Sequence, residues 1–253
     1  MAFSINNSAS AMNANLFANN NQKLSDSLNN FATGKQLNQA ADDAASLAIA
    51  NNLSVQVSEA GQNIMNANDS IGMIQIAEGA VGGINENMDR IRELTLKASN
   101  ATMNDANRAS IQKEIDGLMK SSSQMADSAS YNGISLLDGS DGSLADASSA
   151  LNIEIDVTTA DGLSNALKSI DTAKNSFGQM RSEFGSSQNQ LLSEIQSTSI
   201  FEINAAASES NLRDVDFAQE SMNFNRQSLM SEVGSFVQAQ SNANASNIAR
   251  LFQ

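Results

Sequence analysis

The feature that most constrains this chain is the absence of proline from all 253 residues. A chain of this length would hold about 12 prolines at the typical usage of ~5%. Proline ends or kinks a helix because it lacks a backbone N–H and clashes with the preceding turn. A chain without proline can therefore run in helices longer than those of ordinary globular domains.

The sequence also lacks His, Cys and Trp, and its 28 acidic against 14 basic residues give a formal net charge of −14. Without His or Cys, imidazole acid–base chemistry, thiol nucleophiles and soft-metal sites are excluded. The acidic excess argues against a nucleic-acid partner, which requires a basic surface. We therefore expect a protein that is not an enzyme, with no catalytic residues, no metal and no cofactor.

The longest periodic segment runs from about residue 43 to 99. Its apolar residues, which include Ile64 and Leu94, recur at spacings of three and four. This spacing is typical of a helix in a coiled coil or bundle. Two further helices are expected, at about 105–129 and 163–205.

Between the second and third of these helices the apolar period changes to two. Ile153, Ile155 and Val157 alternate with polar residues, which is typical of a half-buried strand. The apolar run at 134–137 is the expected partner, and the turn residues between them predict a β-hairpin near 133–159. The expected fold class is therefore mainly α, a coiled-coil rod of long helices with one small β-hairpin.

The two ends of the chain are nearly neutral, whereas residues 41–211 carry the net charge of −14. Each end keeps an apolar stripe, so we expect the ends to pair as a second coiled coil. The stripes are either the core of a single-chain bundle or a surface that a neighbouring subunit covers. The candidate assembly residues are Ile5, Met12, Leu16, Leu24, Leu28 and Phe31 at the first end, and Val215, Met222, Leu229, Phe236, Ile248, Leu251 and Phe252 at the second.

Two acidic groups could be mistaken for metal sites. Asp42 and Asp43 are interpreted as a solvated helix start, because negative charge is favourable at a helix N-terminus. The loop that holds Asp138, Asp141 and Asp146 lacks the ligand series and closing Glu of a calcium loop, so it is interpreted as a flexible tip.

No secretory signal is visible at the start of the chain, where the first basic residue is Lys23. No apolar run approaches the ~18 residues of a membrane span, so no membrane insertion is expected. The sequence predicts a protein that is either cytoplasmic or exported by a route that reads no cleaved signal peptide.

Several segments resemble bacterial flagellins in order and spacing. The N-terminal motifs of that family resemble AADDAASLAIANNL (40–53) and NANDSIGMIQIAEGAVGGINENMDRIRELTLKASN (66–100). The segment before the family's hairpin resembles ASYNGISLLDGS (129–140), and its C-terminal rod helix resembles NALKSIDTAKNSFGQMRSEFGSSQN (165–189). The family's terminal helix resembles SNLRDVDFAQESMNFNRQSLM and SFVQAQSNANASNIARLFQ. The resemblance reaches both ends of the chain.

The resemblance implies a discontinuous layout. Residues 1–42 and 206–253 are expected to form a terminal coiled-coil domain in the inner core of a filament, and residues 43–205 a helical rod domain. The expected strand ends near Thr159 and the next helix begins near Leu163, which leaves no room for a variable outer domain. The chain therefore resembles a minimal flagellin.

The resemblance implies a secreted structural subunit that polymerises into the extracellular bacterial flagellar filament for swimming motility. Burial of a terminal apolar stripe and the entropy of ordering about 40 residues nearly cancel, so folding of the ends is expected to be coupled to assembly. The implied partners are further copies of the chain, the flagellar export apparatus, an export chaperone, the filament cap and the hook-junction proteins. A hook–filament junction protein and a cytoplasmic coiled-coil scaffold or chaperone remain alternatives.

The segment 89–98 is expected to serve mainly in subunit packing. Its spacing places four residues on one broad helix face: Arg90, Glu93, Leu94 and Lys97. The resemblance implies a second role for it. In many flagellins this stretch, with a Glu on the next helix, is bound by the animal flagellin-sensing Toll-like receptor. Arg90, Leu94 and Glu114 occupy the matching positions, so the sequence predicts a receptor-competent monomer.

Overall fold

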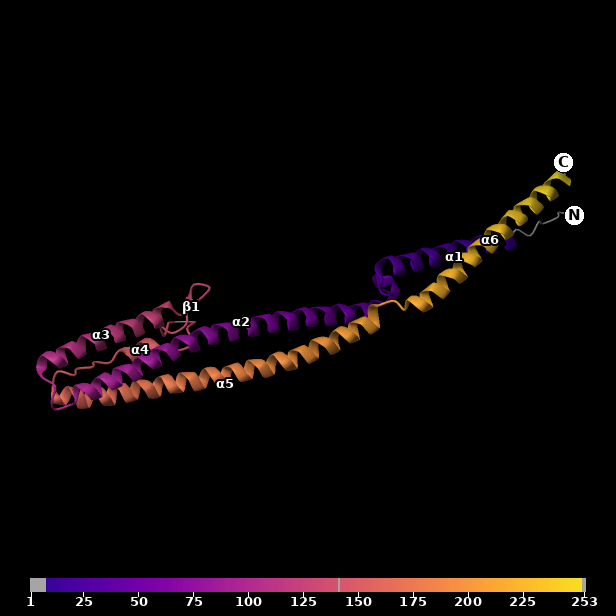
Figure 1. The fold of residues 1–253 in the computed structure, drawn as a ribbon. Coiled ribbons are helices and arrows are strands. Elements are labelled where there is room, and N and C mark those ends of the chain that lie inside the picture. The colour runs from indigo at the N-terminus through magenta and orange to yellow at the C-terminus, as the bar shows by residue number, and fades with distance from the viewer. Residues whose placement is uncertain (1–7, 141, 252–253) are drawn as a thin grey trace. The chain divides into compact units, whose positions relative to one another are not determined.

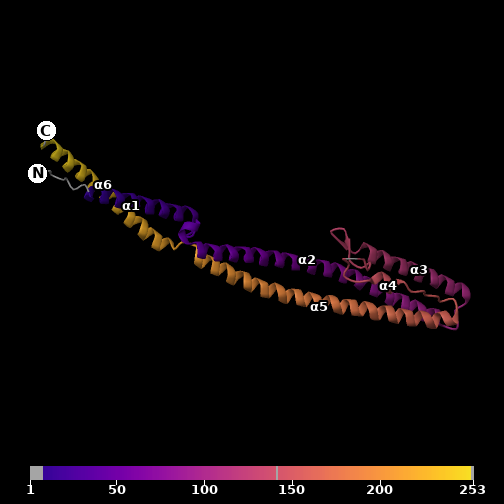
Figure 2. The same cartoon turned by 180° about the vertical axis from the view of Figure 1, so that it is seen from behind.

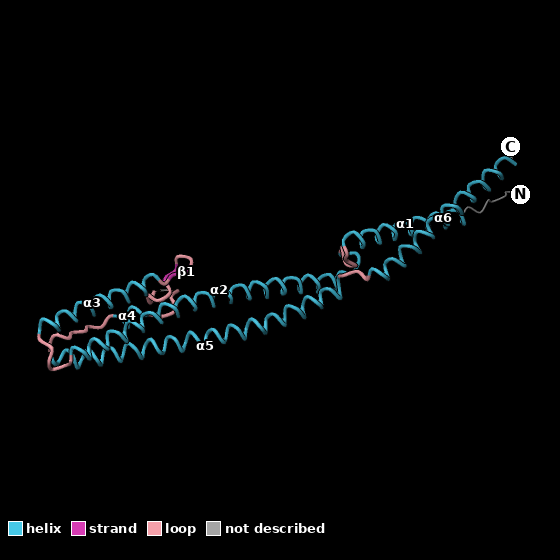
Figure 3. The backbone as a smooth tube through the Cα atoms, in the orientation of Figure 1, coloured by secondary structure: helices cyan, strands magenta, loops and turns pink. Residues whose placement is uncertain are grey.

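The computed structural model describes residues 8–140 and 142–251. Within those ranges the chain forms six helices and one two-stranded sheet, in the order α1, α2, α3, β1, β2, α4, α5 and α6 (Figure 1). Helix accounts for most of the described backbone (Figure 3). The expected class, mainly α with long helices and one small hairpin, is confirmed.

The chain divides into two compact units. The terminal unit consists of Met1–Glu59 and Phe201–Gln253, and the central unit consists of Ala60–Ile200. The helices α2 (Ala40–Ala98) and α5 (Ala160–Arg213) contribute to both units. The terminal unit therefore joins segments from the beginning and the end of the chain.

In the terminal unit, α1 (Ser8–Thr33) packs against α6 (Phe217–Leu251). The two helices lie side by side in both views of the ribbon (Figures 1 and 2). The expected pairing of the chain ends is thus observed.

In the central unit, α2 and α5 pack with α3 (Asp105–Ser128) and the short α4 (Ala147–Leu151) around one apolar core. The apolar stripe of α2, expected from its spacing, lies in this core because its residues recur on one helix face. The fully buried large side chains include Val81, Ile84, Met88 and Ile91 of α2, Ile115 of α3, and Ile170 and Phe177 of α5.

The helix bounds follow local capping signals. Asn104 caps α3 by accepting a hydrogen bond from the Asn107 N–H. The third expected helix is longer than 163–205, because it continues to Arg213. The next helix, α6, begins after Asp216, whose carboxylate accepts hydrogen bonds from the backbone of the first turn.

The expected pairing of 134–137 with a strand at 151–157 is wrong. The observed strands are β1 (Ser130–Tyr131) and β2 (Ile134–Ser135), which pair antiparallel. The turn between them consists of Asn132 and Gly133, with φ values of 51° and 81°. Two positive φ values make the type I′ turn that Asn-Gly favours in short hairpins. The sequence therefore did contain the signal for this hairpin.

The strand expected at 151–157 is not formed: Leu151 ends α4, and 152–157 is a loop whose backbone bonds to a side chain instead of a strand. Gln112 of α3 donates from Nε2 to the Ile155 carbonyl oxygen (2.7 Å) and accepts from the Val157 N–H (2.9 Å). Ile155 and Val157 are buried, whereas Glu154 is exposed. The alternation thus predicted burial correctly and the pairing partner incorrectly.

Candidate functional site

The seam between α1 and α6 contains a small aromatic cluster. The Phe31 ring lies 5.9 Å from the ring of Phe217 and 5.9 Å from that of Phe224, the latter edge to face. Further along the seam, Asn20 donates from Nδ2 to the Gln227 carbonyl oxygen at 2.7 Å. These contacts fix the register of two helices that are almost 200 residues apart in the sequence.

Towards the end of α6, the seam depends on a glycine. A Cβ atom at Gly234 would lie 3.0 Å from Phe17 Cδ2, so the ring packs directly on the helix backbone. A cavity of about 190 Å³ lies beside this contact, lined in part by Leu16, Met230 and Val237.

The same helix pair buries polar atoms without hydrogen-bond partners. The side-chain oxygens of Ser27, Gln227 and Gln238 are buried and unpaired among the described residues. An unpaired buried polar group costs stability, by about 1–3 kcal/mol in typical cases. These unpaired oxygens therefore reduce the stability of the single-chain pairing of α1 and α6.

Six of the thirteen candidate assembly residues have largely exposed side chains. Phe236 is 72% exposed and Met12 is 64% exposed. Leu16, Leu28, Met222 and Leu229 are each more than half exposed. These six side chains are therefore not the core of a single-chain bundle.

The remaining candidate assembly residues fall into two groups. Leu24, Phe31 and Val215 are partly buried. Ile5 and Phe252, and the side chains of Ile248 and Leu251, lie outside the described residues.

More apolar side chains are exposed on α6 than the seven-residue spacing in the sequence indicated. Met230 and Val233 are each 61% exposed, and Val237 is 40% exposed. Steps of three and four from Leu229 would have found Val233 and Phe236 together. We define the terminal apolar face as nine exposed apolar residues of this helix pair: Met12, Leu16, Leu28, Met222, Leu229, Met230, Val233, Phe236 and Val237. Phe217 is also 58% exposed, but its ring contacts Phe31 in the seam, so it is not included.

A short non-helical stretch separates α1 from α2, and another separates α5 from α6. The two stretches lie next to each other. The Gln36 N–H donates to the Arg213 carbonyl oxygen (2.7 Å), and the Val215 N–H donates to the Gly34 carbonyl oxygen (3.1 Å). Gly34 has a φ of +69°, a backbone conformation that suits glycine. Two backbone hydrogen bonds thus connect the two stretches.

Beside this junction, Asp42 accepts backbone hydrogen bonds from residues before it, and Asp43 accepts them from residues after it. Asp42 Oδ2 accepts from the backbone N–H groups of Asn38 and Gln39, while Asp43 Oδ1 accepts from those of Ala45 and Ser46. The hydrogen bonds from Gln39 and Asn38 lower the pKa of Asp42.

The hydrogen bonds from the Ser46 hydroxyl and backbone lower the pKa of Asp43. Regular helical geometry in α2 starts after Asp43, which has φ −163° and ψ 103°. The interpretation of the pair as a helix start is confirmed. No group of three potential metal-binding side chains occurs within the described ranges.

The family profiles match nearly the whole chain. The profile of the bacterial flagellin N-terminal helical region matches residues 3–142, and that of the C-terminal helical region matches residues 167–252. The chain belongs to the bacterial flagellin family. Only residues 143–166 separate the two matches, so this flagellin lacks the variable outer domain.

Individual flagellins support this assignment. Secreted flagellin C of Campylobacter jejuni is 33% identical over 97% of this chain and 98% of its own length. The flagellar filament 31.3 kDa core protein of Treponema maltophilum is 26% identical over 98% of this chain and 99% of its own length. The crystal structure of Bacillus cereus flagellin shares the fold, with a TM-score of 0.50, 21% identity, and coverage of 53% of this chain and 88% of that one.

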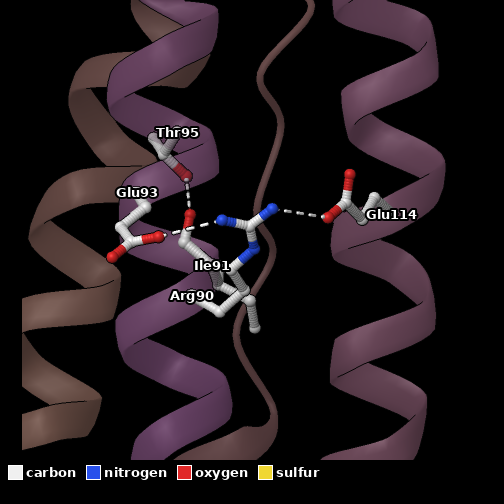
Figure 4. A network of polar contacts seen from close by, with 5 residues as sticks. All are labelled: Arg90, Ile91, Glu93, Thr95 and Glu114. Carbon is white, nitrogen blue, oxygen red and sulfur yellow. Dashed lines mark hydrogen bonds and ion pairs between the residues drawn. The ribbon is translucent and has the colours of Figure 1, made fainter.

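The receptor residues inferred from flagellin resemblance have different surroundings. Figure 4 shows two of them, Arg90 and Glu114, in a network of polar contacts. Arg90 donates to Glu93 on its own helix (2.9 Å) and to Glu114 on α3 (3.2 Å), and all three side chains are about half exposed or more. The hydrogen bonds from Arg90 to Glu93 and Glu114 raise the pKa of Arg90.

Leu94, by contrast, is only 2% exposed and belongs to the core of the central unit. The Leu94 side chain is therefore not accessible beside that of Arg90, and its burial fits its place in the expected apolar stripe. On α2, position 94 continues the buried stripe that contains Ile84 and Ile91.

Ion pairs also connect α2 and α5 of this flagellin across the central unit. Arg92 pairs with Asp171, Lys174 with Asp89, and Arg181 with Glu78. The partners on α5 run in the opposite order to those on α2, as antiparallel helices require. Each pair is partly exposed, so the pairs set the register more than they add stability.

No helix within the described ranges combines the length and the apolar content that a membrane crossing requires.

Proposed function

We propose that this flagellin is a structural subunit that polymerises through its terminal apolar face into the extracellular flagellar filament for swimming motility. The observation that carries the proposal is the exposure of large apolar side chains along both terminal helices of a single chain. Apolar surface that remains contiguous in a soluble subunit marks an interaction site. A self-contact that joins different surfaces of each copy and does not close into a ring gives a helical filament.

Folding of the terminal helices is coupled to this assembly. The buried, unpaired oxygens of Ser27 and Gln227 weaken the α1–α6 seam. Each exposed side chain such as Leu229 or Phe236 gains about 1.5–3 kcal/mol when a neighbour buries it fully. Contacts with neighbouring copies therefore supply stabilisation that the single chain lacks.

The first test concerns filament formation. Electron microscopy of filaments sheared from the cell surface, with mass identification of the subunit, should find this chain. Deletion of residues 212–253 should leave a soluble protein that cannot polymerise, and filaments from the deleted chain would contradict the proposal.

A sharper test changes only the terminal apolar face. The double substitution Leu229→Asn and Phe236→Asn should prevent polymerisation and leave the helical content of the central unit unchanged. The matched control, Leu229→Met with Phe236→Leu, keeps both positions apolar and should polymerise. Circular dichroism of each variant separates loss of assembly from loss of folding.

A second candidate function is a secreted flagellin that remains outside the filament. The name of the Campylobacter relative, secreted flagellin C, favours it, whereas the name of the Treponema relative favours the filament. Recovery of the chain only from the culture supernatant, with filaments built from another subunit, would select this candidate. No observation favours a hook–filament junction protein or a cytoplasmic scaffold.

Export places the chain outside the cell without a cleaved signal peptide. The flagellar export apparatus, an export chaperone, the filament cap and the hook-junction proteins are its further partners, as for the flagellins it resembles. Mass spectrometry of the extracellular protein should find its N-terminal peptide intact apart from the initiating Met. The protein acts structurally and has no catalytic role.

The monomer is also a ligand for the animal flagellin-sensing Toll-like receptor. Arg90 and Glu114 form the accessible part of the site, and the buried Leu94 holds α2 in place beneath them. In a reporter-cell assay, Arg90→Ala should weaken the response, while Arg181→Ala, another partly exposed ion-paired arginine, should not. Absence of response to saturating folded wild type would contradict this role.

A further inference from the structure

Methionine is the side chain of this protein that oxidants will attack first. The sequence holds 11 Met and one Tyr, with no Cys, Trp or His. Thiols usually react before thioethers, and here no thiol competes. The pattern of oxidation therefore depends on which methionines are accessible.

Three accessible methionines lie on the terminal apolar face. Met12 on α1 is 64% exposed, and Met222 and Met230 on α6 are 57% and 61% exposed. Met88, in the core of the central unit, is completely buried. Met65 on α2 is as exposed as Met222 but belongs to the central unit.

The three methionines have apolar neighbours that assembly would bury with them. Met230 lines the cavity beside Phe17 and Leu16. Met222 and Leu229 are seven residues apart on the exposed face of α6, and Met12 and Leu16 are four residues apart on α1. A polar group at any of the three positions would interrupt apolar surface.

We propose that Met12, Met222 and Met230 form an oxidation site, modified by hydroperoxides in the unassembled chain, and that their sulfoxides block polymerisation. The inference rests on the proposed function, because it requires the terminal apolar face to be the assembly surface.

The chemistry is a two-electron oxygen transfer. The methionine sulfur attacks the terminal oxygen of the hydroperoxide, an S=O bond forms, and the O–O bond breaks. Hydrogen peroxide leaves as water, so sulfur is oxidised and the peroxide is reduced. The product is a polar, chiral sulfoxide that methionine sulfoxide reductases convert back to the thioether.

The effect on assembly follows from the lost apolar contact. Replacing a buried thioether by a sulfoxide should raise the critical concentration for polymerisation roughly tenfold per contact. In an assembled filament the same side chains are covered, so they should oxidise more slowly than in the free chain. Oxidation thus acts on subunits before they assemble.

The experiment compares the purified full chain before and after a hydrogen peroxide series. Peptide mass mapping should find the 16 Da addition at Met12, Met222 and Met230 well before Met88, while sedimentation measures the critical concentration. Treated chain should need at least about ten times more protein to polymerise. Treatment with both classes of sulfoxide reductase should restore assembly.

Variants separate the site from general damage. The triple variant Met12→Leu, Met222→Leu and Met230→Leu keeps apolar side chains of similar volume, and peroxide should not change its critical concentration from its own untreated value. The matched variant Met65→Leu should stay as sensitive as wild type. If the untreated triple variant does not polymerise, the deciding measurement is the oxidation rate of the three methionines in wild-type protein. That rate should be lower in filaments than in free chain.

Several results would overturn the inference. It fails if chain carrying all three sulfoxides polymerises at the critical concentration of untreated chain. It also fails if peroxide still raises the critical concentration of the triple variant, or if the three methionines oxidise as fast in filaments as in free chain. Failure of untreated wild type to polymerise would overturn the proposed function as well, so the two failures are distinguishable.

Discussion

The Phe17 ring packs against the bare backbone of Gly234, where an added Cβ would lie only 3.0 Å from Cδ2. This contact brings α1 and α6 closer together than two larger residues would allow. Both residues also line the adjacent cavity of about 190 Å³, so the ring has free space on one side.

We expect Gly234→Val to weaken the α1–α6 pair by about 1–3 kcal/mol, because a branched side chain crowds the ring. The critical concentration for polymerisation, measured by sedimentation, should rise accordingly. Gly178→Val on α5 is the matched control, since a Cβ there meets nothing within 4 Å. Equal effects of the two substitutions would show that crowding at Phe17 is not the cause.

Gln112→Ala should destabilise the central unit by about 1–3 kcal/mol, because it leaves the Val157 N–H buried without an acceptor. Urea unfolding gives the loss of stability, and hydrogen exchange at Val157 should accelerate. Gln62→Ala removes an exposed side-chain hydrogen bond and should change stability by less than about 0.5 kcal/mol. Unchanged exchange at Val157 would contradict the assigned hydrogen bond.

Arg90 and Leu94 should respond differently to salt. Arg90→Ala removes two exposed ion pairs, so its small effect on stability should disappear at about 1 M NaCl. Leu94→Ala leaves a cavity in the core and should cost about 2–5 kcal/mol at any salt concentration. Chemical denaturation by urea at two ionic strengths measures both, and a salt-sensitive Leu94→Ala would contradict the burial of that side chain.

Acid should loosen the junction at Asp42 and Asp43. Hydrogen bonds lower both pKa values in the folded chain, so the stabilisation is present above the unfolded carboxyl pKa of ~3.9 and is lost as the pH falls through the folded values. Between about pH 6 and 8 these groups should leave stability unchanged.

The Asp43→Asn variant should be less stable than wild type at neutral pH, and this difference should shrink below about pH 4. NMR titration of the Asp43 carboxyl measures the pKa directly. The matched control is Asp127→Asn, an exposed residue with no hydrogen bond among the described residues. A difference between Asp43→Asn and wild type that persists in acid would contradict the capping role.

Helices were predictable from this sequence wherever one apolar stripe decides the structure. The spacing through Ile84 and Ile91 predicted α2 and its buried face, because burial of a helical stripe outweighs the weak propensities of individual residues. The same spacing included Leu94, which lies in the core as that spacing predicts. The receptor role of Leu94 came only from the resemblance and stays a prediction.

Pairing partners were not predictable in the same way. Alternation at 153–157 fixes which side chains are buried, but a glutamine on α3 satisfies the backbone as well as a strand would. At the chain ends, an apolar stripe has the same pattern whether it faces a helix of its own chain or another molecule. Only the packing of α1 on α6 distinguishes Phe31, in the seam, from Phe236, outside it.

The backbone hydrogen bonds that join Gln36 to Arg213 and Val215 to Gly34 impose an order on folding. Ribosomes release the first of these segments well before the second, and the partner of α1 is the last helix to be made. Contacts within the central unit need no residue beyond Ile200. The central unit can therefore fold while the chain is still being made. During that interval α1 has no α6 to pair with, so it is accessible to any protein that binds the nascent chain.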